Sequence, residues 1–454
     1  MAAGGTFTPG KEKIRPGNYI NFQSTSKSLN VSEKPGIVVI PLFNHPYGNS
    51  GEFIEITSDN VGTISEKLGM DIDFNNSNML LIREALKACE IVKAYVVVSE
   101  GTKATGTIGD LTATAKCAGT RGNAIRVSIT ENIKSNFDLA VYLDNEKKYE
   151  YSSLSTIGDA IALNCPYVDF SSESELSTKL TESAGVTLSS GTDGTSAIAD
   201  FTKFLDALDY VSFNTVCLPV EPDEDEFESI ATSFVTKVKY LRDNIGKSVV
   251  GVMAKHDANS IAIINVTNAP VVDDIELTAA QATAWVAGLY AASTELDNNT
   301  NHVYPGATGL TGSNLLSHEK IEEAILNGEF VFTLSDSGEV VVEYDINSLV
   351  TPDETQDESY KKNRVIRTFD AVADMLKSKF PIGKYSASEN DFDVMDGIGA
   401  AVLSYFENEG ALENVSEGDF AIDRVNSKGD TAYFNVAIQA VDSIVKSYFT
   451  IATR

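Results

Sequence analysis

Histidine and cysteine are scarce in this 454-residue chain, and their spacing suits neither a metal site nor a redox motif. The four histidines are His45, His256, His302 and His318. None lies within five residues of another, so a zinc site would need ligands that converge from distant parts of the chain. The four cysteines form no CxxC pair and are expected to be free, mostly buried thiols of a reducing compartment. We therefore expect no metal ion and no cofactor.

One glycine-rich stretch invites a phosphate-binding interpretation, namely Gly306-Ala307-Thr308-Gly309-Leu310-Thr311-Gly312. A P-loop ends in Gly-Lys followed by Ser or Thr, and a dinucleotide fingerprint follows a parallel strand. This stretch has neither feature, and we predict a flexible loop.

Covalent catalysis is suggested only by Gly194-Thr195-Ser196, because subtilisin-type proteases carry their nucleophilic serine in a Gly-Thr-Ser turn. In those enzymes the activating Asp and His precede the serine along the chain. The only histidine before Ser196 is His45, and it lies in Asn44-His45-Pro46 rather than in a His-Gly-Thr turn. We expect a helix-capping Ser or Thr here, and we expect that the chain is not an enzyme.

Hydrophobic patterning predicts an α/β core. Ile37–Pro41 and Val92–Val98 are apolar runs typical of strands buried on both faces, and Met79–Ala88 between them has helical spacing. Strand, helix and strand in this order predict a parallel unit with a right-handed crossover. The same α/β pattern resumes after residue 194. It predicts helices at Phe201–Leu208 and Phe227–Asn244 and buried strands at Thr215–Leu218, Ser248–Met253 and Ile261–Val266. A buried helix is expected from Thr278 to about Leu296, and a hairpin around Asp336-Ser337-Gly338.

Between these two halves, Gly101–Gly194 consists of short alternating runs separated by clusters of Gly, Asn, Asp and Ser. The runs are Ile125–Thr130, Leu139–Leu143 and Tyr149–Tyr151. Alternation bounded by turn residues is typical of antiparallel strands. We expect a mostly antiparallel β domain, inserted into the α/β domain.

Beyond an acidic break at Val350–Glu358, the pattern predicts helices at Tyr360–Lys379 and Gly397–Phe406 and a strand at Tyr433–Ala440. A further short strand is predicted at each end of the chain, at Asn18–Ser24 and Tyr448–Ala452. Both terminal strands can pair within their own chain or add to a sheet edge of another molecule, and the pattern alone does not decide between these alternatives.

Charge excludes one class of function. The chain has 35 Lys and Arg against 65 Asp and Glu, a formal net charge of −30 that repels nucleic-acid phosphates. Met1–Lys13 lacks the apolar core of a signal peptide, and the longest apolar runs are far too short to span a membrane. We expect a protein made in a cytoplasm, with no nucleic-acid partner and no direct membrane insertion.

Four stretches resemble parts of one protein family. Arg15-Pro16-Gly17-Asn18-Tyr19-Ile20-Asn21-Phe22 is similar to the N-terminal arm of the contractile tail sheath proteins of bacteriophages and phage-tail-like bacteriocins. Gly191-Thr192-Asp193-Gly194 is similar to the entry of their main α/β domain. Ala284-Trp285-Val286-Ala287-Gly288-Leu289-Tyr290-Ala291 resembles their central small-residue helix. Asn363-Arg364-Val365-Ile366-Arg367-Thr368-Phe369-Asp370 resembles the opening of their C-terminal domain.

The resemblance implies α/β plus β architecture. It comprises a subtilisin-like but non-catalytic α/β core, an inserted antiparallel β domain, and an α+β C-terminal domain with extended terminal strands. The expected parts are an N-terminal arm and linker (1–34), the first part of the α/β domain (35–100), the β insertion (101–194), the remainder of the α/β domain (195–350) and the C-terminal assembly domain (355–454).

The resemblance also implies a structural subunit that polymerises as stacked hexameric rings around a tail tube and contracts to drive the tube through a target cell envelope. The implied partners are other sheath subunits, the tail tube protein, and baseplate and tail-terminator proteins. Assembly is expected in the bacterial host cytoplasm, before release by lysis within a virion tail or bacteriocin particle. The alternatives are a subtilisin-like hydrolase, which lacks a triad here, and a surface-layer or attachment protein, which would usually carry an export signal.

In this family, terminal strands of neighbouring subunits are expected to add to a sheet of the C-terminal domain. The corresponding residues are Asn18, Tyr19, Ile20, Asn21, Phe22, Tyr448, Phe449, Thr450 and Ile451. Hinges are expected at Thr25–Lys34 and around Asp442–Ser447.

A basic segment between Tyr360 and Lys384 interrupts the acidic chain. Its cations are Lys361, Lys362, Arg364, Arg367, Lys377, Lys379 and Lys384, against Asp370 and Asp374. An ordinary solvated helix face would explain this composition. We also consider a patch that faces the inner tube or an acidic surface of the next subunit.

Overall fold

The computed structural model describes residues 3–5, 17–19, 36–49, 51–72, 76–98, 101–222 and 226–452. The chain divides into two units, Met1–Lys34 and Pro35–Arg454. In the first unit, β1 (Ala3–Gly5) pairs in parallel with β2 (Gly17–Tyr19). The first two residues of the predicted strand Asn18–Ser24 thus have a backbone partner within their own chain, and the rest of that strand lies outside the described residues.

A seven-stranded sheet lies at the centre of the second unit, in the order β19-β15-β14-β13-β3-β5-β4. All neighbours are parallel except β4 and β5. Its strands are β3 (Ile37–Phe43), β4 (Phe53–Thr57), β5 (Ile91–Val97), β13 (Thr215–Leu218), β14 (Val250–Ala254), β15 (Ile263–Val266) and β19 (Glu329–Phe330). The five inner strands confirm the predicted apolar runs, whereas the two short edge strands were not predicted.

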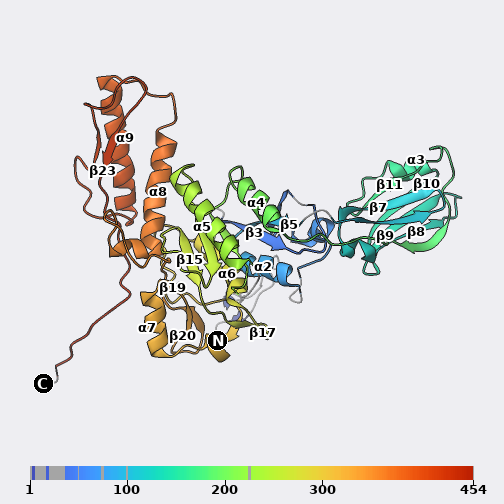
Figure 1. Ribbon diagram of the computed structural model, residues 1–454, viewed down its shortest axis with the longest axis horizontal. Helices are drawn as coiled ribbons and strands as arrows, with labels where there is room; N and C mark the ends of the chain where they lie inside the picture. The colour runs from blue at the N-terminus through green and yellow to red at the C-terminus, as the bar shows by residue number, and fades with distance from the viewer. Residues whose placement is uncertain are drawn as a thin grey trace. The chain divides into compact units, whose positions relative to one another are not determined.

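Helices cover both faces of this sheet (Figure 1). On one face lie α2 (Ser77–Leu86) and α6 (Ala279–Ala292), and on the other α4 (Ile198–Ala207) and α5 (Phe227–Asp243). Alternate residues of β3 enter the two cores, with Val38 and Ile40 in one and Val39 in the other. Because both faces of β3 are buried, every residue of this strand is apolar, as the sequence predicted for Ile37–Pro41.

Helix α6 confirms the prediction of a buried helix. Twelve of its 14 residues are buried, and Thr278 forms a capping box with Gln281 at its start. The helix ends at Ala292 rather than near Leu296, because Ser293 is extended and Asp297 accepts a hydrogen bond from the Thr294 N–H at 2.7 Å.

Residues 103–187 form two antiparallel sheets that enclose one apolar core, as their alternation predicts. The sheet orders are β10-β9-β8-β12 and β11-β7-β6. The strands are β6 (Lys103–Ile108), β7 (Leu111–Ala118), β8 (Ile125–Glu131), β9 (Phe137–Leu143), β10 (Glu146–Leu154), β11 (Val168–Ser171) and β12 (Ser183–Thr187), with α3 (Ile157–Ile161) between β10 and β11.

Small elements border the central sheet. They are α1 (Ser65–Leu68), β16 (Val271–Val272), β17 (Ile275–Glu276), β18 (Ala307–Gly309), α7 (His318–Leu326), β20 (Phe332–Leu334) and β21 (Val340–Val342). β20 and β21 form the predicted hairpin. The prediction of a loop throughout Gly306–Gly312 was wrong, because β18 pairs with the open edge of β16.

The C-terminal part consists of α8 (Asn363–Lys379), α9 (Glu389–Asn408), β22 (Phe420–Ile422) and β23 (Phe434–Val436). Helix α9 begins well before the predicted Gly397, because the Ser388 hydroxyl caps it by accepting from the Asp391 N–H. The predicted strand Tyr433–Ala440 shortens to β23, and Tyr448–Ala452 pairs with no other described residue. Within the described ranges, none of the helices is both long and apolar enough to cross a membrane.

Candidate assembly site

Ser196 and His45, the residues of the protease hypothesis, hold the backbone in place. The Ser196 hydroxyl accepts from the Asn44 N–H at 2.7 Å and donates to the Val97 carbonyl. His45 uses both ring nitrogens elsewhere, with Leu68 O at 2.9 Å and the Asn78 amide at 3.2 Å. The two side chains therefore do not form a nucleophile and base. The capping prediction also needs correction, because the residue that precedes α4 at its N-cap is Ala197.

Burial keeps the thiols of Cys89 and Cys117 protonated. All four cysteines are free and buried, and burial raises the pKa of Cys89 to about 12 and that of Cys117 to about 11. Among the residues that the structure describes, no group of three or more His, Cys, Asp and Glu side chains is placed to hold a metal ion.

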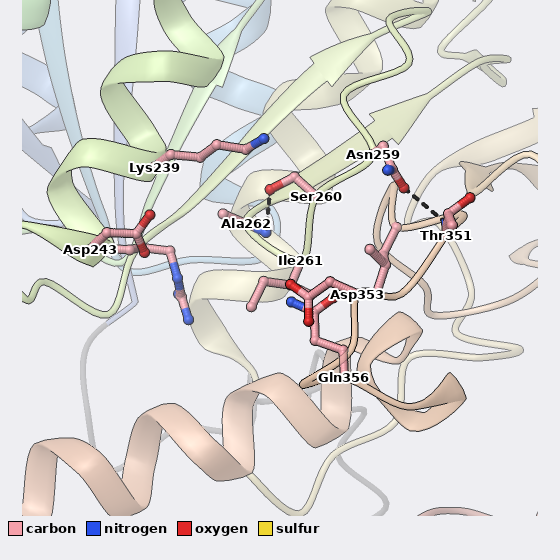
Figure 2. Close-up of a pocket in the computed structure, with 11 residues that line it drawn as sticks. Lys239, Asp243, Asn259, Ser260, Ile261, Ala262, Thr351, Asp353 and Gln356 are labelled. Atoms are coloured by element: carbon pink, nitrogen blue, oxygen red, sulfur yellow. Dashed lines mark hydrogen bonds between the residues drawn. The ribbon is translucent and has the colours of Figure 1, made fainter.

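A polar pocket of about 340 Å³ lies beside α5, at the start of the segment that leads to α8 (Figure 2). Asn259 accepts from the backbone N–H groups of Val350 and Thr351 at 2.8 and 3.0 Å, which fastens this linking segment. The Ser260 hydroxyl accepts from the Ala262 N–H at 3.2 Å. The described lining includes neither histidine nor cysteine.

Exposed apolar side chains instead gather in the C-terminal arm, which we define as residues 444–452. Ile444, Tyr448, Phe449 and Ile451 are 89, 91, 86 and 88% exposed. The arm makes no hydrogen bond, ion pair or ring contact with any other described residue, and it extends away from the C-terminal helices (Figure 1). Four large apolar side chains in one nine-residue segment are thus exposed, and exposed apolar patches of this kind often mark protein–protein interaction sites.

The root of this arm, residues 437–443, is fastened to its own chain. Ala440 bridges to Leu412, and the Val441 N–H donates to the Ala411 carbonyl at 2.9 Å. Asp442 then forms an ion pair with Lys362, and the Ser443 hydroxyl accepts a hydrogen bond from Arg364. The last described contact is therefore at Ser443, the second residue of the predicted hinge Asp442–Ser447.

Beside the root lies a two-stranded antiparallel sheet, β22 and β23. Its inner residues Phe420 and Ile422 are buried, and Phe420 contacts Phe380 and Phe434 with ring centroids 5.8 and 5.4 Å apart. A two-stranded sheet is marginal alone. Its β22 edge is partly covered, because the Ile422 N–H donates to the Asp396 side chain of α9 at 2.7 Å, and this leaves the β23 edge for a further strand.

The basic segment does not form one solvent-facing patch. Arg364 and Arg367 are buried, and Lys362 is half-buried against Asp442. Lys361 pairs with Glu358 at 2.8 Å, and Lys377 donates to the Gly246 carbonyl at 2.6 Å. The two remaining cations, Lys379 and Lys384, are exposed beside Ile382, which is fully exposed in the turn after α8.

One buried and one half-buried ion pair attach α8 to the central sheet domain, and sequence reasoning did not predict this role. Arg367 pairs with Asp345 at 2.9 Å and donates to the Asp297 carbonyl at 2.8 Å. Asp370 accepts two hydrogen bonds from Arg242 of α5, at 2.9 and 2.6 Å. A run of cations usually indicates a solvated face, and no local signal marks these arginines as internal.

Three segments of the chain match family models of phage tail sheath domains. Residues 99–193 match the "Phage tail sheath protein beta-sandwich domain", residues 194–348 the "Phage tail sheath protein central domain", and residues 355–454 the "Phage tail sheath C-terminal domain".

Relatives match over nearly the full length. The protein YqbK of Bacillus subtilis (strain 168) is 34% identical over 99% of this chain and 100% of its own length. XkdK of the phage-like element PBSX, from the same strain, is 32% identical over 99% of both chains. The crystal structure of the sheath tail protein of Desulfitobacterium hafniense is 31% identical, with a TM-score of 0.78 over 94% of this chain and 97% of that one.

A sheath protein of a contractile assembly with much lower sequence identity has a similar fold. The helical sheath of the anti-feeding prophage, determined in its contracted state, has a TM-score of 0.54 over 97% of this chain and 99% of that one, at 14% identity. At this identity the match concerns the fold alone.

Proposed function

This chain belongs to the phage tail sheath family, and we propose that it polymerises as stacked hexameric rings around a tail tube and contracts to drive the tube through a cell envelope. It is a structural subunit of a tail sheath rather than an enzyme. The observation that carries the proposal is the C-terminal arm, whose exposed apolar side chains have no partner among the described residues of the chain.

Energetics indicate why the arm needs neighbours. Burying four large apolar side chains contributes about 1.5–3 kcal/mol each. Five or six main-chain hydrogen bonds add about 0.5–1.5 kcal/mol each. Ordering the backbone of the arm costs about 1–2 kcal/mol per residue, so a single arm binds only marginally. Many arms that act together would hold a polymer firmly while each link stays weak enough to rearrange.

The receiving surface is the β23 edge of the β22–β23 sheet in a neighbouring subunit, since Asp396 of α9 already binds the Ile422 N–H on the β22 side. The C-terminal contribution comprises Tyr448, Phe449, Thr450 and Ile451. On the N-terminal side, Asn18 and Tyr19 would have to leave β1 or carry it with them, and Ile20, Asn21 and Phe22 lie outside the described residues.

Further parts of the proposal rest on family membership. The partners are other subunits, the tail tube protein, and baseplate and tail-terminator proteins. The chain assembles in the host cytoplasm and leaves in a virion tail or bacteriocin particle after lysis. A subtilisin-like topology of the core is likewise proposed. It is supported by the mostly parallel sheet with helices on both faces.

Deletion of Tyr448–Arg454 tests the role of the arm. The deletion removes three of the four exposed apolar side chains and no described contact, so we expect a folded chain that no longer polymerises. Negative-stain microscopy with sedimentation should show tubes or ring stacks for the full chain and monomers for the truncation. A second variant keeps the full length of the chain and changes Tyr448, Phe449 and Ile451 to serine, and it should also fail to polymerise. Normal sheaths from either variant would refute strand exchange through this arm.

A further inference from the structure

The position at which the C-terminal arm leaves the protein is fixed by side chains, not only by the backbone. Asp442 and Ser443 are the last two residues of the root, and each contacts a cation near the start of α8. Lys362 is the residue immediately before α8, and Arg364 lies in its first turn. These four residues, Lys362, Arg364, Asp442 and Ser443, are called the clasp below.

The base of the clasp is itself immobilised. Asn363, which lies between the two cations, donates its side-chain amide to Asp345 at 2.8 Å and its backbone N–H to the Asp345 carbonyl at 3.1 Å. Arg367, one turn further along, pairs with the same carboxylate at 2.9 Å. The cations that hold the arm therefore belong to a helix end that is fastened to the central domain through buried groups.

Arg364 gives the clasp its strength. Its side chain is buried, yet no described carboxylate pairs with it, and Nε has no hydrogen-bond partner among the described residues. A buried guanidinium depends strongly on each partner that remains, because an unpaired buried charge is costly. The Ser443 hydroxyl is such a partner, so Arg364 favours the conformation in which the root lies against α8.

We propose that the clasp is a positioning device for strand exchange, which sets where and in which direction each C-terminal arm leaves its subunit. This inference rests on the proposed function. Beyond Ser443 the arm is free to follow a neighbour, whereas up to Ser443 it moves with α8 and the central domain. An arm with a fixed origin meets its acceptor edge in one register, because a shift of one residue would present the opposite set of side chains.

A charge-swap cycle tests the clasp. The variants are Lys362→Asp, Asp442→Lys and the double variant, compared by polymer yield in sedimentation and microscopy. We expect each single variant to lower the polymer yield at least tenfold, because like charges would force the root off α8. The double variant should recover to within about threefold of the original chain. Hydrogen exchange at the Val441 amide should accelerate in the single variants and return in the double variant.

Control variants separate the clasp from general charge effects. Lys428→Asp changes an exposed lysine of the same domain that lies outside the clasp and the basic segment, and it should leave polymer yield unchanged. Ser443→Ala keeps every charge and removes one hydroxyl, so it provides a milder test if a charge variant fails to fold. Normal polymerisation by Asp442→Lys, or failure of the double variant to recover while it remains folded, would overturn the inference.

The same series distinguishes this inference from the proposed function. If the chain that lacks Tyr448–Arg454 still polymerises, strand exchange through the arm is wrong. If that truncation fails to polymerise while both single clasp variants and Ser443→Ala assemble normally, the arm is needed but the clasp does not position it.

Discussion

Ser196 shows that a residue type carries no chemistry without its neighbours. Its hydroxyl joins the ends of β3 and β5 through Asn44 and Val97. His45 lies on the adjacent backbone, but its ring turns inward to Leu68 and Asn78. The sequence predicted the absence of a triad from chain order alone, and the structure adds what these side chains do instead.

The buried imidazole of His45 predicts a pH dependence of stability. Burial lowers its pKa to about 4, against 6.5 in the unfolded chain, although the hydrogen bond to Leu68 opposes the shift. Above pH 6.5 the ring is neutral in both states. As pH falls from 6.5 towards 4, the unfolded chain binds a proton that the folded chain rejects. The free energy of unfolding should therefore fall by about 3 kcal/mol over this range.

Urea unfolding at several pH values measures this contribution. The variant His45→Gln should lose that part of the pH slope, whatever its absolute stability. His318→Gln is the matched control, since the His318 side chain is 86% exposed on α7. If His45→Gln retains the full slope between pH 6.5 and 4, another group is responsible.

At the scale of elements, two glycines in α9 should respond in opposite ways to substitution by alanine. A Cβ atom at Gly397 would meet nothing within 4 Å, whereas one at Gly399 would lie 2.1 Å from the Phe420 ring. Gly397→Ala should raise the free energy of unfolding by about 0.5–1 kcal/mol, because glycine is costly in a helix interior. Gly399→Ala should lower it by about 1–3 kcal/mol, because β22 must move away from α9. Changes of the same sign in denaturant unfolding would contradict this packing.

The same elements show how far the sequence predicts the fold. The inner strands and α6 were predictable because their residues are mostly apolar and Thr278 caps the helix. The start of α9 was missed although Ser388 caps it and Phe392 and Met395 already lie at helical spacing, because acidic residues and two glycines interrupt the apolar pattern there. The basic segment was misleading for a physical reason, since Arg367 is neutralised by Asp345, a residue outside the segment.

At the scale of the whole molecule, the net charge of −30 must be accommodated wherever many copies pack together. Most cations near α8 are already used within the chain, by Asp442, Asp345, Glu358 and the Gly246 carbonyl. Lys379 and Lys384 are the exposed members of the predicted basic patch whose side chains make no described ion pair or hydrogen bond, and they lie on either side of the exposed Ile382. An apolar residue between two lysines suits an acidic partner surface with an apolar centre.

Reversal of these two lysines tests whether the turn after α8 docks on an acidic partner, which we propose to be the tail tube or a neighbouring subunit. One exposed charge pair contributes only about 0.2–1 kcal/mol, but each subunit of a sheath would repeat the contact. The variant Lys379→Glu/Lys384→Glu should therefore assemble on tubes at least tenfold less at low salt, and high salt should narrow the difference by screening. Lys428→Glu, in an exposed turn of the same domain, controls for the added negative charge. Co-sedimentation with purified tubes gives the measurement, and equal assembly of all three chains at low salt would show that these lysines remain solvated in the sheath.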